Sequence, residues 1–117
     1  MKAMVLEKQG EELQHREVEK PVPGDNQLLI KVQVCGVCRT DLHILDGDLD
    51  EPKLPLIPGH QIVSTVEEAG KDTGDFKRGQ KVGVPWLGKT CGKCEFCKKG
   101  EENLCEKALF TGYDIDG

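Results

Sequence analysis

Hydrophobic residues occur along this chain in short runs, and glycine, proline or charged residues separate each run from the next. The runs with β-favouring composition are Met4–Glu7, Leu13–Val18, Leu28–Val34, Ile62–Glu67 and Lys81–Val84. Short strands separated by turn residues at this spacing are typical of a small barrel or sandwich. The pattern therefore predicts a mainly β domain.

The run Leu28–Val34 has the clearest alternation, with polar residues at Lys31 and Gln33 between apolar neighbours. Successive side chains of a strand point to opposite faces, so a period of two indicates one buried face. We expect that face to be formed by Leu28, Ile30, Val32 and Val34.

One segment has the pattern of a short helix. Thr40 or Asp41 is suited to cap its first turn, and Gly47 is suited to end it. The helix would carry His43. Three prolines follow and predict an irregular, extended connection that leads to His60.

Composition limits the classes of protein that fit. With 117 residues, 37% of them hydrophobic and 32% charged, the chain has the size and composition of one globular domain. Its net charge of -5 argues against a nucleic-acid partner, including the zinc-ribbon type of binder. There is no signal-like start and no apolar run near the ~20 residues that span a bilayer, so we predict a cytoplasmic protein without a membrane partner.

The glycines exclude one common nucleotide-binding motif. No two glycines are separated by a single residue, so a G-x-G-x-x-G phosphate loop is absent, and strands do not alternate with long helices. We therefore expect no Rossmann-type cofactor domain within residues 1–117.

Four of the six cysteines have the spacing C-x2-C-x2-C-x7-C and lie in what we call the four-cysteine lobe, residues 88–108. Four thiolates suit a tetrahedral zinc ion and leave no open position, which predicts a structural zinc site. A disulfide scaffold, a redox pair and an iron tetrathiolate centre are the alternatives. The predicted ligands are Cys91, Cys94, Cys97 and Cys105.

A second group of candidate ligands lies upstream. Cys38 and His60 are zinc-type ligands, but no obvious third protein ligand accompanies them. The plainer interpretation of this region makes Cys35 a small buried hydrophobe, Thr40 a helix cap and His43 a surface residue.

Read in order, the strings GVCRTDLH (residues 36–43) and LPLIPGH (residues 54–60), followed by the four-cysteine lobe, resemble the amino-terminal catalytic domain of the zinc-dependent medium-chain alcohol dehydrogenases. The resemblance implies a GroES-like distorted β-barrel with a structural zinc on a protruding loop. It also implies that Cys38 and His60 bind the catalytic zinc, with a third ligand, a cysteine, supplied by a nucleotide-binding domain.

The same resemblance assigns roles around that zinc. Thr40 and His43 would pass the alcohol's proton outward, and Asp41 would orient the imidazole of His60. Arg39 would contact the cofactor's pyrophosphate. The walls of the alcohol pocket would be Leu49 and Trp86, with a core tryptophan as the alternative interpretation of Trp86.

Two features depart from the family pattern. Gln61 stands where the family usually has a glutamate beside the zinc-ligand histidine, and the sequence ends at Gly117, well before a cofactor domain. We therefore expect a fragment, inactive alone, of a homo-oligomeric enzyme that oxidises small primary alcohols to aldehydes with NAD. Polyol, threonine and formaldehyde-type relatives share the zinc ligands. The rival hypothesis is a stand-alone zinc-binding module, or a half that pairs with a separate cofactor domain.

Overall fold

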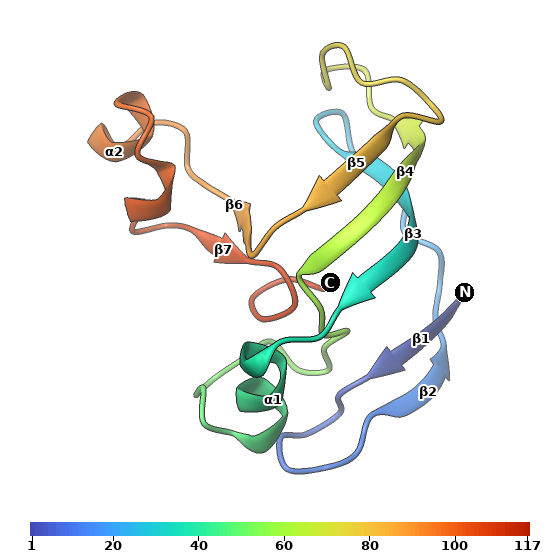
Figure 1. The fold of residues 1–117 in the computed structure, drawn as a ribbon. Helices are drawn as coiled ribbons and strands as arrows, with labels where there is room; N and C mark the ends of the chain where they lie inside the picture. The colour runs from blue at the N-terminus through green and yellow to red at the C-terminus, as the bar shows by residue number, and fades with distance from the viewer.

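The computed structural model describes all residues from Met1 to Gly117 and is mainly β, as predicted. Its strands form three small antiparallel sheets (Figure 1). Each of the predicted strand runs overlaps a strand. The first sheet pairs β1 (Lys2–Val5) with β2 (Gln14–Glu17), the central sheet has the order β3 (Leu28–Gly36), β4 (Gln61–Ala69), β5 (Lys81–Val84), and the third pairs β6 (Leu87–Lys89) with β7 (Leu109–Phe110).

Helix α1 (Arg39–Asp46) begins slightly earlier than the sequence predicted. Its N-cap is Cys38, so the assignment of Thr40 or Asp41 as the cap is wrong. The reason is that the Asp41 carboxylate, in the first turn, accepts a hydrogen bond of 2.7 Å from the Cys38 backbone N–H. The predicted end is confirmed, because Gly47 adopts the left-handed conformation with φ of +88°.

The sequence predicted one helix, and the structure contains two further helical turns inside the four-cysteine lobe. These are α2 (Glu95–Lys98) and a 3-10 turn (Glu102–Leu104). Cys94 caps α2, since its sulfur accepts a hydrogen bond of 3.5 Å from the Cys97 N–H. A ligand spacing of three residues matches one helical turn, so α2 follows from the same pattern that predicts the metal site.

The expectation of one continuously buried face on β3 is wrong. Leu29 is the buried residue of this strand, whereas Val32 and Val34 are 50% and 62% exposed. Register shifts against β4 at Leu29/Ile30 and at Val32/Val34 interrupt the alternation. The interpretation of Cys35 as a buried hydrophobe is also wrong, because this residue is exposed.

The centre of the core joins three segments that are distant in sequence. Leu6, Ile44 and Leu56 are fully buried and come from the residue after β1, from α1 and from the connection before β4. Backbone hydrogen bonds of 2.8 and 3.0 Å between Leu6 and Leu56 align the outer two segments. Burial of each such side chain stabilises the fold by about 1.5–3 kcal/mol, so this core fixes α1 and, with it, Cys38.

The C-terminal residues lie against the segment that leads to His60. The Gly117 N–H donates to the Ile57 carbonyl at 2.8 Å, and the Ile57 N–H donates to the Asp116 carboxylate at 2.9 Å. A Cβ atom on Gly112 would lie 2.5 Å from the carbonyl oxygen of Gly59, so the two backbones are in direct contact. Both glycines have positive φ, +72° and +120°, which L side chains rarely adopt.

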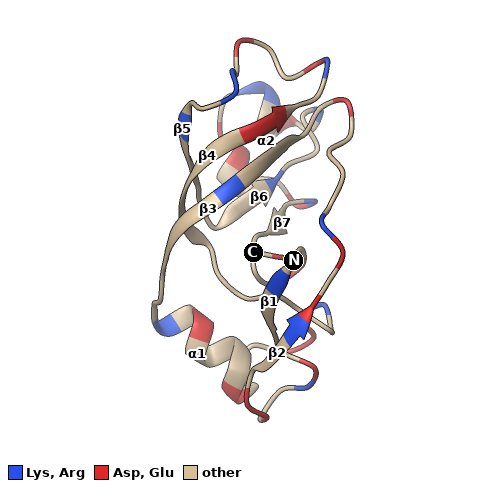
Figure 2. Ribbon diagram, turned by 90° about the vertical axis from the view of Figure 1, so that its right-hand side faces the viewer, with Lys and Arg blue, Asp and Glu red and all other residues tan.

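Charged residues of both signs are interspersed over the ribbon in Figure 2. The helices are all too short to cross a bilayer.

Candidate metal centres

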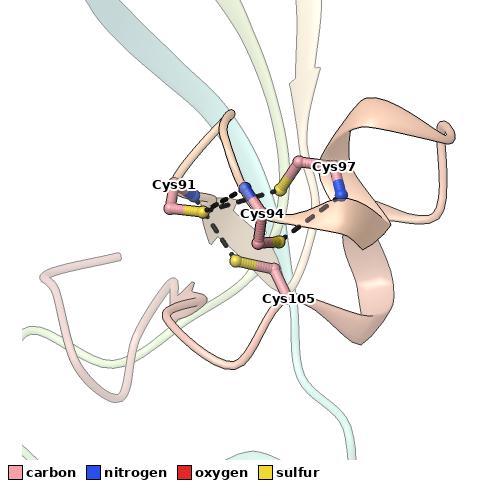
Figure 3. Close-up of side chains that lie close together, drawn as sticks. All are labelled: Cys91, Cys94, Cys97 and Cys105. Atoms are coloured by element: carbon pink, nitrogen blue, oxygen red, sulfur yellow. Dashed lines mark hydrogen bonds between the residues drawn. The ribbon is translucent and has the colours of Figure 1, made fainter.

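The four predicted cysteines converge in the lobe between β6 and β7 (Figure 3). Their sulfur atoms all lie within 4.8 Å of one another, and those of Cys91 and Cys97 are 3.9 Å apart. A regular tetrahedron with metal–sulfur bonds of roughly 2.3 Å has edges of about 3.8 Å. The donor set and its spacing therefore fit a four-coordinate zinc ion.

Backbone N–H groups of the lobe point at the sulfur atoms. The Cys94 N–H donates to Cys91 Sγ at 3.3 Å, and the Cys91 N–H donates to Cys105 Sγ at 3.4 Å. The N–H groups of Lys93 and Cys94 lower the pKa of Cys91 to about 6. Although the Cys97 N–H favours the thiolate of Cys94, desolvation and the neighbouring thiols raise the pKa of Cys94 to about 11. The loop is thus arranged to stabilise negative charge first at Cys91.

The second group lies where the start of α1 meets the start of β4. Cys38 Sγ and His60 Nε2 are 3.2 Å apart, and His60 Nδ1 is 3.3 Å from Asp41 Oδ1. Sulfur and nitrogen ligands on one tetrahedral zinc would be separated by about 3.5 Å. His60 and Asp41 are buried, with exposed fractions of 5% and 7%, and neither of these two facing atoms makes a hydrogen bond.

This geometry determines what His60 can do. A carboxylate beside Nδ1 favours the tautomer that carries its proton there, which leaves the Nε2 lone pair directed toward Cys38. Cys38, Asp41 and His60 therefore fit a metal ion as well, but with an incomplete set of protein ligands.

An open cleft of about 980 Å³ lies over Cys38 and His60. It is lined also by Thr40, Leu49, Gln61 and Trp86, which the sequence analysis had singled out. Arg39 and His43 do not line it: Arg39 is exposed at the first position of α1, and His43 lies one turn further along the helix.

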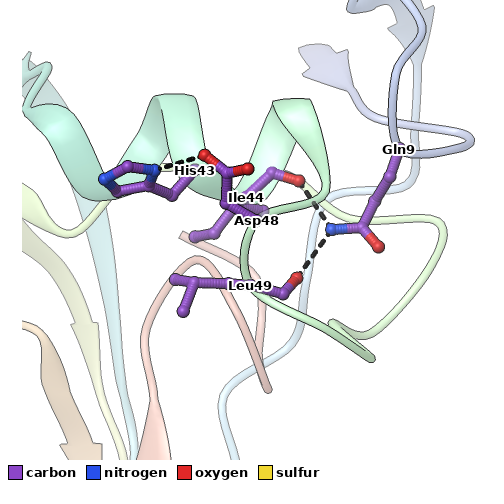
Figure 4. A network of polar contacts seen from close by, with 5 residues as sticks. All are labelled: Gln9, His43, Ile44, Asp48 and Leu49. Atoms are coloured by element: carbon purple, nitrogen blue, oxygen red, sulfur yellow. Dashed lines mark hydrogen bonds and ion pairs between the residues drawn. The ribbon is translucent and has the colours of Figure 1, made fainter.

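Two residues near His43 were missed by the sequence analysis (Figure 4). His43 Nδ1 lies 2.7 Å from the Asp48 carboxylate, and the side-chain amide of Gln9 donates to the carbonyls of Ile44 and Leu49, both at 2.8 Å. Gln9 thereby ties the end of α1 to the loop that carries Asp48 and Leu49. Gly47, predicted to end the helix, is a signal that the chain reverses there and can bring Asp48 close to His43. Nothing in the sequence indicated the contacts of Gln9.

Trp86 is half-buried and contacts both the cleft and the core. Its indole meets the His60 imidazole edge-on, with ring centres 4.7 Å apart and an interplanar angle of 70°. The indole also stacks on Phe110, with ring centres 5.0 Å apart and an interplanar angle of 19°. The interpretations of Trp86 as a cleft wall and as a core residue are therefore both consistent with its position.

Comparisons with known proteins agree with this picture. An alcohol dehydrogenase from Geobacillus stearothermophilus is 48% identical over 118 residues, covering 100% of this chain and 35% of its own length. A cobalt- and zinc-bound thermostable alcohol dehydrogenase from Pyrobaculum aerophilum superimposes with a TM-score of 0.90 at 32% identity, covering 100% of this chain and 36% of its own. For CAD from Helicobacter pylori, solved with NADP(H), the TM-score is 0.87 at 32% identity, with coverage of 97% and 33%.

This chain therefore spans about a third of the length of the relatives it matches. The model of the alcohol dehydrogenase GroES-like domain matches residues 24–117, which include every candidate ligand described above. With the strand order, the two cysteine-containing centres and this match in agreement, the chain belongs to the alcohol dehydrogenase GroES-like domain family.

Proposed function

We propose that this chain forms the substrate-facing part of a zinc-dependent alcohol dehydrogenase that oxidises small primary alcohols to aldehydes with NAD or NADP. The observation that carries the proposal is the convergence of Cys38 Sγ and His60 Nε2 at 3.2 Å under an open cleft, with Asp41 behind the imidazole. The family and the alcohol dehydrogenases among its relatives support the reaction class.

The proposal includes two metal ions, one structural and one catalytic. Cys91, Cys94, Cys97 and Cys105 would hold a structural zinc, and Cys38 and His60 a catalytic one whose third protein ligand lies outside residues 1–117. A zinc ion bound there supplies Lewis acidity, which lowers the pKa of the alcohol. Asp41 would keep the imidazole of His60 oriented with Nε2 toward Cys38.

Thr40 and His43 would carry the proton that the alcohol loses as its hydride passes to the nicotinamide. Thr40 lines the cleft, and its hydroxyl can accept from the alcohol while donating onward. His43 lies one turn along α1 and is 38% exposed in its side chain, which suits the outer, solvent-facing end of a relay. Asp48 holds the His43 ring by its Nδ1, so Nε2 is the atom free to exchange the proton.

The remaining residues would define what binds. Leu49 and Trp86 narrow the cleft with apolar surface, which favours small alcohols. The exposed guanidinium of Arg39 is available to the cofactor's pyrophosphate, as the resemblance implies. Gln61 lines the cleft but brings no charge to the metal, unlike the glutamate usual in the family.

The test uses cobalt as a spectroscopic substitute for zinc. The lobe is first filled with one equivalent of zinc, and cobalt is then titrated into the reduced chain. We expect a weak site with a thiolate-to-cobalt absorption band that Cys38→Ser abolishes. Cys35→Ser is the matched control, because this exposed cysteine is not among the candidate ligands, and it should keep the band.

A band that persists in Cys38→Ser would contradict the proposed ligand set. An activity assay provides a second test of the proposed function. The 117-residue chain should reduce no NAD with ethanol, because a third ligand and a nucleotide domain lie outside it. If a separately produced cofactor domain restores activity on mixing, the chain works as one half of a split enzyme.

A further inference from the structure

The four-cysteine lobe is joined to the rest of the molecule by a two-stranded stalk, β6 and β7 (Figure 1). Trp86 directly precedes β6, and Phe110 is the last residue of β7. Leu87 pairs with Phe110, and the Thr111 N–H donates to the Trp86 carbonyl at 2.9 Å. Beyond this stalk, no hydrogen bond or ion pair links the lobe to another part of the chain.

The lobe has little apolar packing of its own. Neither α2 nor the 3-10 turn contains a buried residue, and Cys105 is the buried residue of the lobe. A pair of strands this short is marginal without further support. Metal binding by the four cysteines is therefore the main interaction available to order the lobe and to keep the strands of the stalk together.

Three rings continue from the stalk to the second centre. Phe110 stacks on Trp86, and the indole also contacts the imidazole of His60 and, more distantly, the ring of Tyr113. His60 is 5% exposed, so its ring cannot turn without displacing these neighbours. Asp41 restrains the Nδ1 side of the imidazole, and Trp86 restrains the plane of the ring.

We infer that metal occupancy of the four-cysteine lobe is coupled to the Cys38–His60 centre through Phe110 and Trp86. Metal in the lobe fixes the stalk, the stalk holds Phe110 against Trp86, and Trp86 holds His60 facing Cys38. Phe110 is then a positioning residue. The inference rests on the proposed function insofar as it takes Cys38 and His60 as metal ligands. Linkage makes the effect reciprocal, so each site raises the affinity of the other by the same factor.

The first experiment isolates the lobe's effect in the Cys38→Ser chain, whose second centre lacks its thiolate. Zinc is added to the chelator-stripped, reduced protein while the emission of Trp86, the only tryptophan, and the ring signals of the three histidines are recorded. We expect both the emission and the His60 signals to change and to saturate near one equivalent. The signals of His15, which is exposed on β2, should stay constant.

The control for direct metal binding to His60 is the double variant Cys38→Ser, Cys105→Ser, in which the lobe cannot close. Its emission and His60 signals should not respond to one equivalent of zinc. If the lobe of the single variant binds zinc while Trp86 and His60 remain unchanged, the coupling is refuted.

The second experiment measures the cobalt affinity of the Cys38–His60 centre with the lobe filled by zinc. Phe110→Leu keeps an apolar residue on β7 but removes the stacked ring, and we expect the affinity to fall about two- to tenfold, the size of one aromatic pair interaction. Phe76→Leu makes the same chemical change at a 45% exposed phenylalanine outside the stalk and should leave the affinity unchanged.

Equal affinities for wild type and Phe110→Leu would overturn the role of Phe110. The proposed function fails in a different way: the wild-type chain would then show no Cys38-dependent cobalt band at all. In that case the zinc response of Trp86 and of the metal-free His60 in the first experiment still decides whether the lobe is coupled to this residue.

Discussion

The two cysteine-containing centres of this chain are built in opposite ways. The four ligands of the lobe lie within fifteen residues of sequence, and their own loop points N–H groups at the sulfurs. Cys38 and His60 are separated by 22 residues, and their meeting depends on α1, β4, the central core and the C-terminal segment. One centre is therefore a product of local geometry, and the other is a product of the tertiary fold.

This difference explains why the first centre is closed and the second is open. A loop can wrap four sulfurs around one ion because its ligands have no other task. A centre assembled from the end of a helix and the start of a strand leaves one side free, and here that side is a cleft of about 980 Å³. Openness is what a metal needs if a substrate is to reach it.

Of the changes considered, removal of metal should have the largest structural effect, and that effect should be a loss of order in the four-cysteine lobe. Structural zinc in small sites has an apparent binding free energy of about 10–16 kcal/mol, and little other packing orders residues 88–108. After chelation, or in Cys97→Ser, we expect the amide protons of the lobe to lose their exchange protection while those of β3 and β4 keep theirs.

Hydrogen exchange combined with elemental analysis measures this effect. Cys35→Ser should keep both the zinc and the protection, since Cys35 is exposed and is not among the candidate ligands. A lobe that stayed protected without metal would show that it is ordered by contacts other than those described.

The second prediction concerns a variant that should disturb the Cys38–His60 centre and leave the four-cysteine lobe intact. In Gly112→Ala the new methyl group would lie 2.5 Å from the Gly59 carbonyl, at a residue with φ of +72°. Overpacking and backbone strain together should lower the free energy of unfolding by about 2–5 kcal/mol. Urea denaturation measures this, and zinc per chain should remain the same as in the wild type.

Gly74→Ala is the matched control, because Gly74 also has a positive φ, +67°, but nothing lies within 4 Å of the added methyl group. Its cost should be limited to the strain at one residue, about 1 kcal/mol. If the two variants were equally stable, the backbone contact between Gly59 and Gly112 would not be a tight one.

The third prediction concerns the orientation of His60. Asp41→Asn keeps an oxygen that can accept from the Cys38 N–H but removes the charge that faces His60 Nδ1. Loss of such a partner typically lowers metal affinity by about 10- to 100-fold. We expect a decrease of this size in the cobalt affinity of the Cys38–His60 centre, with the zinc of the lobe retained. Asp48→Asn, an exposed carboxylate just beyond the same helix, should not alter it.

The smallest effect should come from a surface ion pair that belongs to neither centre. A hydrogen bond from Lys20, 2.9 Å in length, lowers the pKa of Glu67 below its usual value. Because the folded-state pKa is lowered, the pair stabilises the fold above the ordinary pKa of a glutamate, and this contribution is lost as the pH falls through the lowered value. In an NMR titration, Lys20→Gln should raise the midpoint of Glu67 while leaving metal content and the denaturation midpoint nearly unchanged. An unchanged midpoint would show that Lys20 does not set the ionisation of Glu67.

The four-cysteine site could be predicted from the sequence, whereas the Cys38–His60 centre could be predicted only in part. Spacing alone predicted the convergence of Cys91, Cys94, Cys97 and Cys105, because the geometry of a short loop restricts where its sulfurs can lie. For Cys38 and His60 the residues contained no such restriction, and the pairing came from the resemblance to a family. The contacts made by Gln9, Asp48 and Phe110 had no comparable signal, since each depends on segments brought together by the fold.

The positions of the strands were predicted well, whereas the predicted buried face of β3 was wrong. The runs at Leu28–Val34 and Ile62–Glu67 became β3 and β4, but two register shifts moved Val32 and Val34 away from a common buried face. The start of α1 was misplaced for a similar reason. The capping bond from the Cys38 N–H to Asp41 depends on the direction of a side chain, which residue type alone does not determine.

The contact between Gly112 and Gly59 also has a consequence for the order in which the two centres can form during folding. All four sulfurs of the lobe lie within fifteen residues of sequence, so the lobe can close around a metal without waiting for distant segments. The surroundings of His60 are completed only when residues 112–117 reach the segment around Gly59, more than fifty residues earlier in the sequence. Contacts of such long sequence separation form late, because the intervening chain must first be ordered. The four-cysteine lobe can thus take shape before the open cleft over Cys38 and His60 is complete.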